Sequence, residues 1–238
     1  MNLSKIGSAT AVAAMALAVT LAGCGSDSSS DSSASSTTSS AAASTSSAST
    51  SESLEPRDID DAAGTNFTIA DYIKDNNIKE TPIKMGDPDA PTIDLPIPEG
   101  WSPAGDDTPD YAYAAIVYTG EDASGSDYTP NFVALMSRLE GNVDADALIE
   151  AAGGELKNLP SAEIIYEREA TLSGFPAYEI AATYDLEGTE ALSAQKTVII
   201  TTPSGETYIL QLNGTSDQAQ ADILGDAANT IDTATIEP

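Results

Sequence analysis

The sequence predicts an α+β fold in which helices cover an antiparallel sheet, built as a single domain from residue 57 to residue 238. Apolar, β-branched runs of strand length are joined by short turns such as Ser173-Gly174 and Ser204-Gly205, and strands joined by tight turns must be antiparallel. Segments with helical spacing stand before, between and after these runs, so helices can cover a sheet face that would otherwise be wet. Residues 24–56 have too little apolar surface to form a core.

The first 23 residues have the pattern of a bacterial lipoprotein signal peptide. Lys5 supplies a positive charge, and residues 6–20 are dominated by Ala, Val, Leu and Met, a stretch too short for a stable transmembrane helix. Leu21-Ala22-Gly23-Cys24 follows in the order of a lipobox, which predicts cleavage between Gly23 and Cys24 and attachment of diacylglycerol to the Cys24 thiol. The alternative is an ordinary secretory leader with an accidental cysteine.

Lipidation gives a use to Cys24, which is the only cysteine and cannot form an internal disulfide. Each buried acyl methylene contributes about 0.8 kcal/mol, so two or three chains such as palmitate make a nearly permanent anchor. We therefore expect a protein held by lipid at the extracytoplasmic face of the cell membrane. Residues 24–56, rich in Ser, Ala and Thr, are expected to be a disordered tether, with O-glycosylation of its hydroxyls as an alternative role.

Charge and composition exclude several classes of function. The formal net charge of −29 would repel nucleic acid and anionic lipid head groups. The chain has no histidine, which removes the usual zinc sites, the Ser-His-Asp arrangement and the commonest general base. Acidic pairs such as Asp106-Asp107 lack the spacing of a calcium loop. The sequence therefore predicts no catalytic residues, no metal site and no cofactor.

The first predicted elements are a helix and a long extended segment. Thr68 and Asp71 form a capping-box-like start, after which Ile69, Tyr72 and Ile73 share one helix face. Residues 81–103 are rich in proline and are expected to be extended, with residues 95–98 restricted to edge or irregular conformation. This segment leads to Trp101, the only tryptophan.

A strand pair and a second helix are expected next. Residues 111–118 and 132–139 are apolar, with aromatic and β-branched members, and are separated by a polar loop. Asp144 is placed to cap a helix whose apolar residues recur at helical spacing. This helix is expected to end near Gly153-Gly154 or to continue as far as Leu159, before Pro160.

The rest of the chain is expected to form a meander followed by a closing helix. The predicted strands are 164–172, 176–184, 193–202 and 207–213. Asn213-Gly214 is interpreted as the turn into the last helix, which is expected over residues 216–231.

Seven short blocks of the folded domain, in one order, resemble the LpqN/LpqT family of lipoproteins from mycobacteria and related actinobacteria. They are Thr68-Ile69-Ala70-Asp71-Tyr72-Ile73, Ala90-Pro91-Thr92-Ile93-Asp94-Leu95-Pro96, Pro98-Glu99-Gly100-Trp101, Glu155-Leu156-Lys157-Asn158-Leu159-Pro160, Leu172-Ser173-Gly174-Phe175-Pro176-Ala177-Tyr178, Gln195-Lys196-Thr197-Val198 and Leu210-Gln211-Leu212-Asn213. The resemblance implies a fold of the Mog1/PsbP type. It also implies a non-enzymatic envelope protein that assists the transport or assembly of trehalose glycolipids and mycolate-containing lipids, and it carries over no catalytic residues.

Two hypotheses of function follow. In the first, the domain binds a lipid or glycolipid in a groove between sheet and helix. The candidate lining residues are aromatic: Trp101, Tyr111, Tyr113, Phe132, Phe175, Tyr178 and Tyr208. The ordinary alternative for each is a place in the core. Trp101 stands out because its apolar body and single donor suit either a lid over the core or a platform on which a sugar stacks.

In the second hypothesis, the domain is a protein-interaction module that docks a membrane transporter or another envelope protein. Residues 81–103 are the candidate contact, because their prolines would lower the ordering cost of binding. The alternative for this segment is a connection that covers a sheet edge. A hydrolase is disfavoured because the chain offers neither histidine nor a nucleophile elbow.

Overall fold

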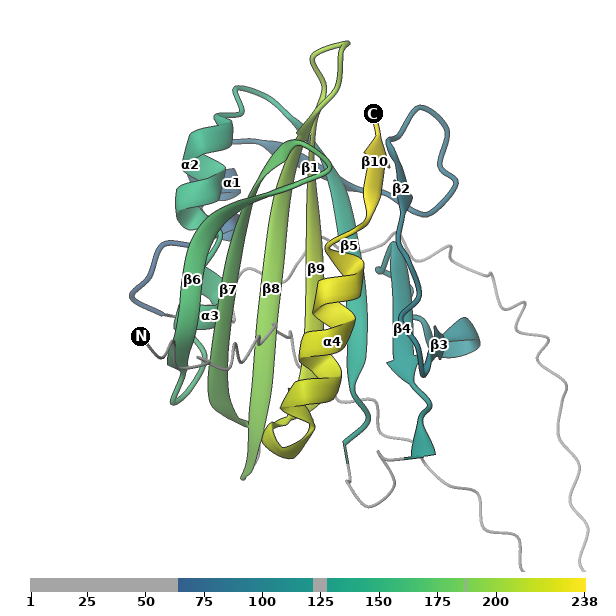
Figure 1. Ribbon diagram of the computed structural model, residues 1–238. Helices are drawn as coiled ribbons and strands as arrows, with labels where there is room; N and C mark the ends of the chain where they lie inside the picture. Colours follow the sequence, from purple (N-terminus) through teal and green to yellow (C-terminus); the bar gives the residue numbers. More distant parts are fainter. Residues whose placement is uncertain (1–63, 122–127, 187) are drawn as a thin grey trace, which may run out of the picture. The chain divides into compact units, whose positions relative to one another are not determined.

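An antiparallel sheet dominates the computed structural model, which describes residues 64–121, 128–186 and 188–238. Its strand order is β3-β4-β5-β9-β8-β7-β6, and β1 pairs with β5 beyond the end of β4 (Figure 1). The strands are β1 (Lys79–Pro82), β3 (Trp101–Pro103), β4 (Ala114–Tyr118), β5 (Asn131–Glu140), β6 (Glu163–Leu172), β7 (Phe175–Leu186), β8 (Thr189–Thr201) and β9 (Thr207–Asp217). The expected signal peptide and tether, with Gly23 and Cys24, lie outside the described residues.

Helices lie on both faces of this sheet, which confirms the predicted α+β architecture. α4 (Ala221–Ile231) lies on one face, together with a two-stranded sheet of β2 (Thr92–Asp94) and β10 (Thr235–Glu237). On the opposite face are α1 (Ile69–Asp75), α2 (Ala145–Ala151) and α3 (Gly154–Lys157), which gather toward β6 and β7 in Figure 1. We call these the α4 face and the α1–α3 face. No helix among the described residues is both long and apolar enough to cross a membrane.

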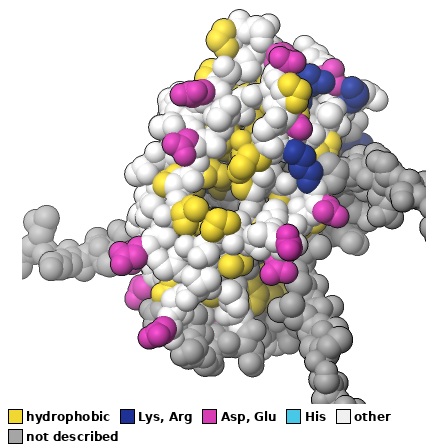
Figure 2. Space-filling model, turned by 90° about the vertical axis from the view of Figure 1, so that its right-hand side faces the viewer, with side chains coloured by type: hydrophobic (Ala, Val, Ile, Leu, Met, Phe, Trp, Pro, Cys, Tyr) yellow, Lys and Arg dark blue, Asp and Glu magenta, His cyan; other side chains and the backbone are white. Residues whose placement is uncertain are grey.

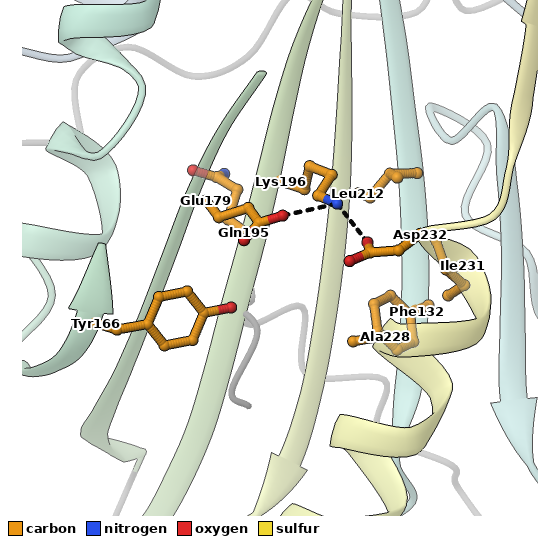
Figure 3. Close-up of a pocket in the computed structure, with 9 residues that line it drawn as sticks. All are labelled: Phe132, Tyr166, Glu179, Gln195, Lys196, Leu212, Ala228, Ile231 and Asp232. Atoms are coloured by element: carbon orange, nitrogen blue, oxygen red, sulfur yellow. Dashed lines mark hydrogen bonds and ion pairs between the residues drawn. The ribbon is translucent and has the colours of Figure 1, made fainter. Parts of the chain in front are cut away.

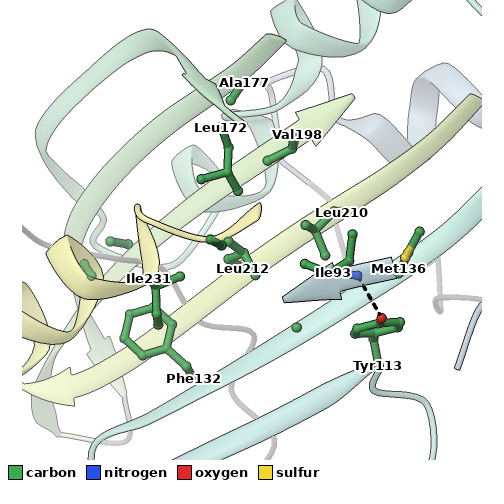
Figure 4. Close-up of a cluster of buried hydrophobic side chains, with 14 of the residues drawn as sticks. Ile93, Tyr113, Phe132, Met136, Leu172, Ala177, Val198, Leu210, Leu212 and Ile231 are labelled. Carbon is green, nitrogen blue, oxygen red and sulfur yellow. Dashed lines mark hydrogen bonds between the residues drawn. The ribbon is translucent and has the colours of Figure 1, made fainter. Parts of the chain in front are cut away.

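The larger part of the core lies on the α4 face. Because side chains alternate along a strand, Leu210 and Leu212 of β9 point to this face, where Ile231 of α4 belongs to the same cluster. Ile93 and Ile236 of the small sheet join it, and the Ile93 backbone N–H donates to the Tyr113 hydroxyl at 3.4 Å (Figure 4). The small sheet is therefore anchored through its own buried side chains.

A second core cluster on the α1–α3 face holds α1 and α2 against the sheet. Ile69 and Tyr72 of α1 and Leu148 of α2 pack with Ile199 of β8 and Ile209 of β9. A third, smaller cluster joins α3 to β7 through buried aliphatic side chains, which are Leu156, Ile180 and Ala182. The core on this face thus lies at one end of β8 and β9 and along β7.

The first helix begins where the sequence predicts. The Thr68 hydroxyl accepts from the Asp71 backbone N–H at 3.0 Å, and an Asp71 carboxylate oxygen accepts from the Thr68 backbone N–H at 3.0 Å. These two bonds form the reciprocal capping box. Asp144 likewise caps α2, since its carboxylate accepts from the backbone N–H groups of Asp146 and Ala147.

Removing the Thr68 cap is expected to destabilise the domain by about 1 kcal/mol. In a Thr68→Ala variant the N–H of Asp71 loses its acceptor, whereas Thr68→Ser keeps the hydroxyl and is expected to stay within about 0.5 kcal/mol of the natural chain. Chemical denaturation followed by circular dichroism measures both values. Equal losses of stability in the alanine and serine variants would show that the Thr68 methyl group, and not its hydroxyl cap, stabilises the domain.

The predicted meander is confirmed, with strands longer than expected. β6, β7, β8 and β9 pair in sequence as antiparallel neighbours, and β4 and β5 form the expected separate pair. β4 begins at Ala114, three residues later than predicted. The helix after Asp144 stops at Ala151, and residues 154–157 form the separate helix α3.

The interpretation of Asn213-Gly214 as a turn is wrong. β9 continues through both residues to Asp217, and Gly214 pairs with Phe132 of β5 and Ala194 of β8. A Cβ at Gly214 would lie 2.6 Å from the Phe132 ring, so glycine is needed here for the close approach of an aromatic ring. The last helix consequently begins at Ala221, after a 3-10 turn whose capping box joins Asp217 and Gln220.

Candidate ligand-binding face

Part of the α1–α3 face carries side chains that join none of the described core clusters. Four apolar residues of β4 and β5 that point away from the α4 core are Ala115, Val117, Val133 and Leu135. All four are half-buried, and none belongs to a hydrophobic cluster of the described residues. Ala115 pairs with Val133, so these side chains form two adjacent rows. We call them the apolar rows.

Polar side chains continue this surface on β8 and β9. Beyond the paired residues Ile199 and Ile209, the next three cross-strand pairs that point to this same face are uncharged and polar. They are Thr197 with Gln211, Gln195 with Asn213, and Ser193 with Thr215. All six are buried. We call them the amide ladder.

The apolar rows and the amide ladder are direct neighbours. Val133 pairs with Asn213 and Leu135 pairs with Gln211 across β5 and β9. Since residues directly opposite on one face lie roughly 5 Å apart, the surface changes from aliphatic to polar over a single strand spacing. Because the six ladder side chains are buried, a molecule with one apolar part and one polar part can contact them only after a local opening of this face.

The hydrogen bonding of the amide ladder is incomplete. Gln195 Nε2 donates to Asn213 Oδ1 at 2.9 Å, and Asn213 Nδ2 donates to the Val133 carbonyl at 3.5 Å. Gln195 Oε1 and Thr197 Oγ1 are buried and have no hydrogen-bond partner among the described residues. Buried polar atoms nearly always have a partner, and one that lacks it calls for an explanation such as a bound molecule. The two oxygens can accept hydrogen bonds, and the threonine hydroxyl can also donate one.

The structure brings together five of the seven aromatic residues predicted to line a groove. Trp101, Tyr113, Phe132 and Tyr208 belong to the core of the α4 face, and Phe175 packs against it. Trp101 is 6% exposed, with its ring centroid 5.6 Å from those of Tyr118 and Phe132. This position matches the lid over the core rather than a platform open to a sugar.

The other two predicted residues lie elsewhere. Tyr178 is on the α1–α3 face, where its hydroxyl donates to Glu167 at 2.5 Å. Tyr111 is half-buried in the turn before β4, outside the described core clusters. Tyr208, by contrast, is almost completely buried and donates to the Asp89 carbonyl at 3.0 Å.

A cavity lies on the α4 face beneath the C-terminal end of α4 (Figure 3). Phe132, Leu212 and Ile231 line its apolar part, and Tyr166 and Lys196 line its polar part. Its volume is about 20 Å³, which is room for roughly one water molecule. A lipid chain does not fit this cavity unless α4 moves.

Ion pairs stand beside this cavity, and in one of them, Lys196 with Glu179, both side chains are buried. Lys196 Nζ lies 2.8 Å from Glu179 Oε1 and also pairs with Asp232 at the end of α4. Arg168 Nε lies 2.5 Å from the other oxygen of Glu179. Burial alone would raise the pKa of Glu179, but the hydrogen bonds from Lys196 and Arg168 outweigh burial and hold that pKa below its usual value. Glu179 is therefore a fully paired carboxylate.

The tyrosines near these ion pairs are held protonated. Burial, followed by the negative charge of Glu179, raises the pKa of Tyr166 to about 12. Burial and the hydrogen bond to Glu167 likewise raise the pKa of Tyr178. A general base at neutral pH needs a pKa near 7, and neither hydroxyl meets that condition. These groups can stabilise the fold but are unsuited to proton transfer at neutral pH.

Comparison with known proteins places the chain in a family. A family model described as probable lipoprotein LpqN matches residues 65–236. The chain belongs to the LpqN family. It is 45% identical to the lipoprotein LpqN of Mycobacterium tuberculosis over 178 residues, which cover 73% of this chain and 75% of that protein. It is 30% identical to the putative lipoprotein LpqT of Mycobacterium leprae over 128 residues, or 52% of this chain and 55% of that protein.

A crystal structure of M. tuberculosis LpqN, described as involved in cell envelope biogenesis, has the same fold. It matches with a TM-score of 0.68 at 42% identity, covering 74% of this chain and all of that chain. The resemblance to the LpqN/LpqT family is thus confirmed, and membership of the LpqN family associates this protein with the cell envelope. Both relatives are named as lipoproteins.

Sequence reasoning missed the amide ladder of this LpqN-family protein. Polar residues at alternate positions of a strand normally form its wet face, so residues 193–197 and 211–215 carried no special signal. The kind of side chain at these positions, rather than their alternation, could have indicated the ladder. Six alternate positions on neighbouring strands carry amides and hydroxyls without one charge, in a chain where 20% of the residues are charged.

Proposed function

We propose that this protein is a non-enzymatic envelope lipoprotein, anchored through lipid on Cys24, that binds a glycolipid on its α1–α3 face. The sugar of the ligand contacts the amide ladder and its acyl chain contacts the apolar rows. A trehalose- or mycolate-type lipid has this division into an uncharged head group and apolar chains. In this role the protein assists the transport or assembly of envelope lipids.

The observation that carries the proposal is the pair of buried oxygens on Gln195 and Thr197 that lack a hydrogen-bond partner among the described residues. They lie on β8, and only β9 separates them from Val133 and Leu135 on β5. Once local opening exposes these buried oxygens, a sugar hydroxyl can supply the missing hydrogen bonds, which removes the cost of leaving a buried polar group unpaired. Val133 and Leu135 are half-buried and can lose further apolar surface to an acyl chain. The involvement of M. tuberculosis LpqN in cell envelope biogenesis supports a ligand of envelope origin.

Charge favours an uncharged head group over a phosphate. All six side chains of the amide ladder are neutral, and the chain carries a net charge of −29. A phosphate head group would lose hydration without gaining a cationic partner on the ladder, and the surrounding negative charge would repel it. The proposal assigns no reaction, which is consistent with the absence of histidine from the sequence.

Removing single polar atoms from the ladder is expected to weaken glycolipid binding without unfolding the protein. Thr197→Val and Gln195→Leu each delete a hydrogen-bonding group at nearly constant volume, so each is expected to raise the Kd about three- to tenfold. The measurement is native mass spectrometry of the chain from residue 24, with Cys24→Ser, titrated with an acyl trehalose and with phosphatidylglycerol of equal chain length. The natural sequence is expected to bind the first and not the second.

Thr201→Val is the matched control. Thr201 lies on β8 at the same alternation as Thr197, but it is exposed and outside the ladder, so its replacement should leave the Kd unchanged. Thermal unfolding of each variant checks the fold. Equal binding of both lipids, or a Thr197→Val variant with unchanged affinity, would contradict the assignment of the head group to the ladder.

A further inference from the structure

The side of the molecule formed by β2, β3 and β4 exposes hydrophobic side chains. Figure 2 shows them running down this side, with acidic side chains around them. The loops at the two ends of β2 carry the most exposed large hydrophobic residues of this part of the chain: Met85 is 61% exposed and Ile97 is 52% exposed. Scattered exposed apolar residues are ordinary, so the argument depends on how these two are held and on what surrounds them.

Both loops are held in place by the core. In the first loop, the Asp87 backbone N–H donates to the Lys84 carbonyl at 3.1 Å, and the Lys84 N–H donates to the Asp87 carboxylate at 2.8 Å. These two bonds close a turn that presents Met85, two residues after the buried residue Ile83. The Met85 backbone is therefore ordered before any partner arrives, which lowers the entropic cost of binding.

The second loop is stiffened by its prolines. Pro96 and Pro98 flank Ile97, and Pro98 is buried while Ile97 is exposed. Proline fixes its own φ and restricts the residue before it. The loop is tied at one end to β2, which pairs with β10, and at the other end to the buried Trp101. Residues 81–103 are predicted to be extended, and the structure shows three short paired strands, β1, β2 and β3, in this part of the chain. Exposed loops stiffened by hydrogen bonds and prolines join them.

Within residues 83–110 all charged residues except Lys84 are acidic, whereas Figure 2 shows lysine and arginine side chains toward one edge of this side. Between residues 83 and 110 every acidic side chain is exposed: Asp87, Asp89, Asp94, Glu99, Asp106, Asp107 and Asp110. The single cation of this stretch, Lys84, donates to the Ala112 carbonyl at 3.4 Å. A partner protein would therefore be electrostatically complementary if cations surround its apolar contact surface.

We propose that Met85 and Ile97, with the acidic residues around them, form a docking surface for a protein that presents an apolar depression rimmed by lysine and arginine. A second copy of this chain is disfavoured as the occupant because the same acidic surface would face itself. An anionic membrane is disfavoured for the same reason. This surface is separate from the amide ladder, so one protein can hold a lipid and a partner together.

Site-specific photocrosslinking of the full-length lipoprotein in a Mycobacterium host tests this proposal. The photoreactive residue p-benzoylphenylalanine replaces Ile97 in one strain and Ile165 in another. Ile165 is 42% exposed and lies on the edge strand β6, so it reports on non-specific contacts of an exposed isoleucine. Crosslinked peptides are identified by mass spectrometry, and each variant is checked for folding by thermal unfolding after purification.

The expected result is a protein adduct from position 97 that is absent from position 165, with a crosslinked peptide containing lysine or arginine. Its yield is expected to fall at least about fivefold with Met85→Ser and with Asp94→Asn/Glu99→Gln. Glu163→Gln/Glu169→Gln on β6 is the charge-matched control and should not change it. The proposal is overturned if position 97 gives no protein adduct, the same adducts as position 165, a lipid adduct or a crosslink to another copy of this chain. It is equally overturned if the neutralised variant crosslinks as well as the natural sequence.

Discussion

Replacing Gly154 by alanine is expected to lower the free energy of unfolding by about 3 kcal/mol. A Cβ at this position would lie 2.1 Å from the Phe67 carbonyl oxygen, 2.7 Å from its carbon and 2.9 Å from the Thr68 Cα. All three are backbone atoms, so no side-chain rotation relieves the clash. Gly154 is the first residue of α3, and Thr68 caps α1. Separating them would disturb the packing of both helices on the α1–α3 face.

The neighbouring glycine provides the control for this prediction. A Cβ at Gly153 would lie 3.1 Å from the side-chain atoms Ile180 Cδ1 and Tyr178 Cε1, which can shift by a few tenths of an ångström. Gly153→Ala is therefore expected to cost less than about 1 kcal/mol. Urea denaturation monitored by fluorescence and circular dichroism measures both variants. Similar losses at the two positions would show that α3 can move away from the Thr68 segment at little cost.

Local signals in the sequence predict most of the elements of this fold. The capping box of Thr68, the cap at Asp144 and the turn at Ser173-Gly174 each depend on residues within a few positions of one another. Such short-range chemistry can be read directly from a chain. The pairing of consecutive strands in the meander follows from their tight turns for the same reason.

Features that depend on distant contacts could not be predicted in this way. Gly214 has the sequence signal of a turn, but the Phe132 ring from β5 requires a glycine within a strand. β10 is three residues long and exists because β2, far away in the chain, supplies its partner. The amide ladder likewise becomes visible only when the register of β8 and β9 aligns Thr197 with Gln211. Each depends on tertiary packing overriding or completing a local pattern.

The aromatic candidates for the groove illustrate the same limit. Trp101 and Phe132 contact each other across the core of the α4 face, where their size contributes to packing. A large aromatic residue has the same local pattern whether it fills a core or lines a site. Uncharged polar residues on a buried strand face are more informative, because burying an amide or a hydroxyl has a cost unless it is hydrogen-bonded. Gln195 and Thr197 therefore carry the functional argument that the aromatic residues do not.

Replacing Lys196 by methionine is expected to lower the free energy of unfolding by about 3 kcal/mol at neutral pH. Lys196 is 7% exposed and Glu179 is 5% exposed, so the variant leaves a buried carboxylate with Arg168 as its remaining cation. It also removes the ion pair that joins β8 to Asp232 at the end of α4. The double variant Lys196→Met/Glu179→Gln also removes the buried carboxylate charge and is expected to recover part of the lost stability.

Acidification is expected to shrink the difference between the natural chain and Lys196→Met. The pKa of Glu179 is lowered in the folded protein, so its stabilising contribution is present above the ordinary glutamate pKa of 4.5 and is lost as the pH falls through the lower folded value. Lys157→Met is the control, because Lys157 pairs with Glu167 where both side chains are partly exposed, and it should cost less than about 1 kcal/mol. Denaturation of all four proteins between pH 7 and pH 3 measures these effects. A Lys196→Met deficit that is small at neutral pH, or that grows on acidification, would show that Lys196 does not stabilise the Glu179 carboxylate.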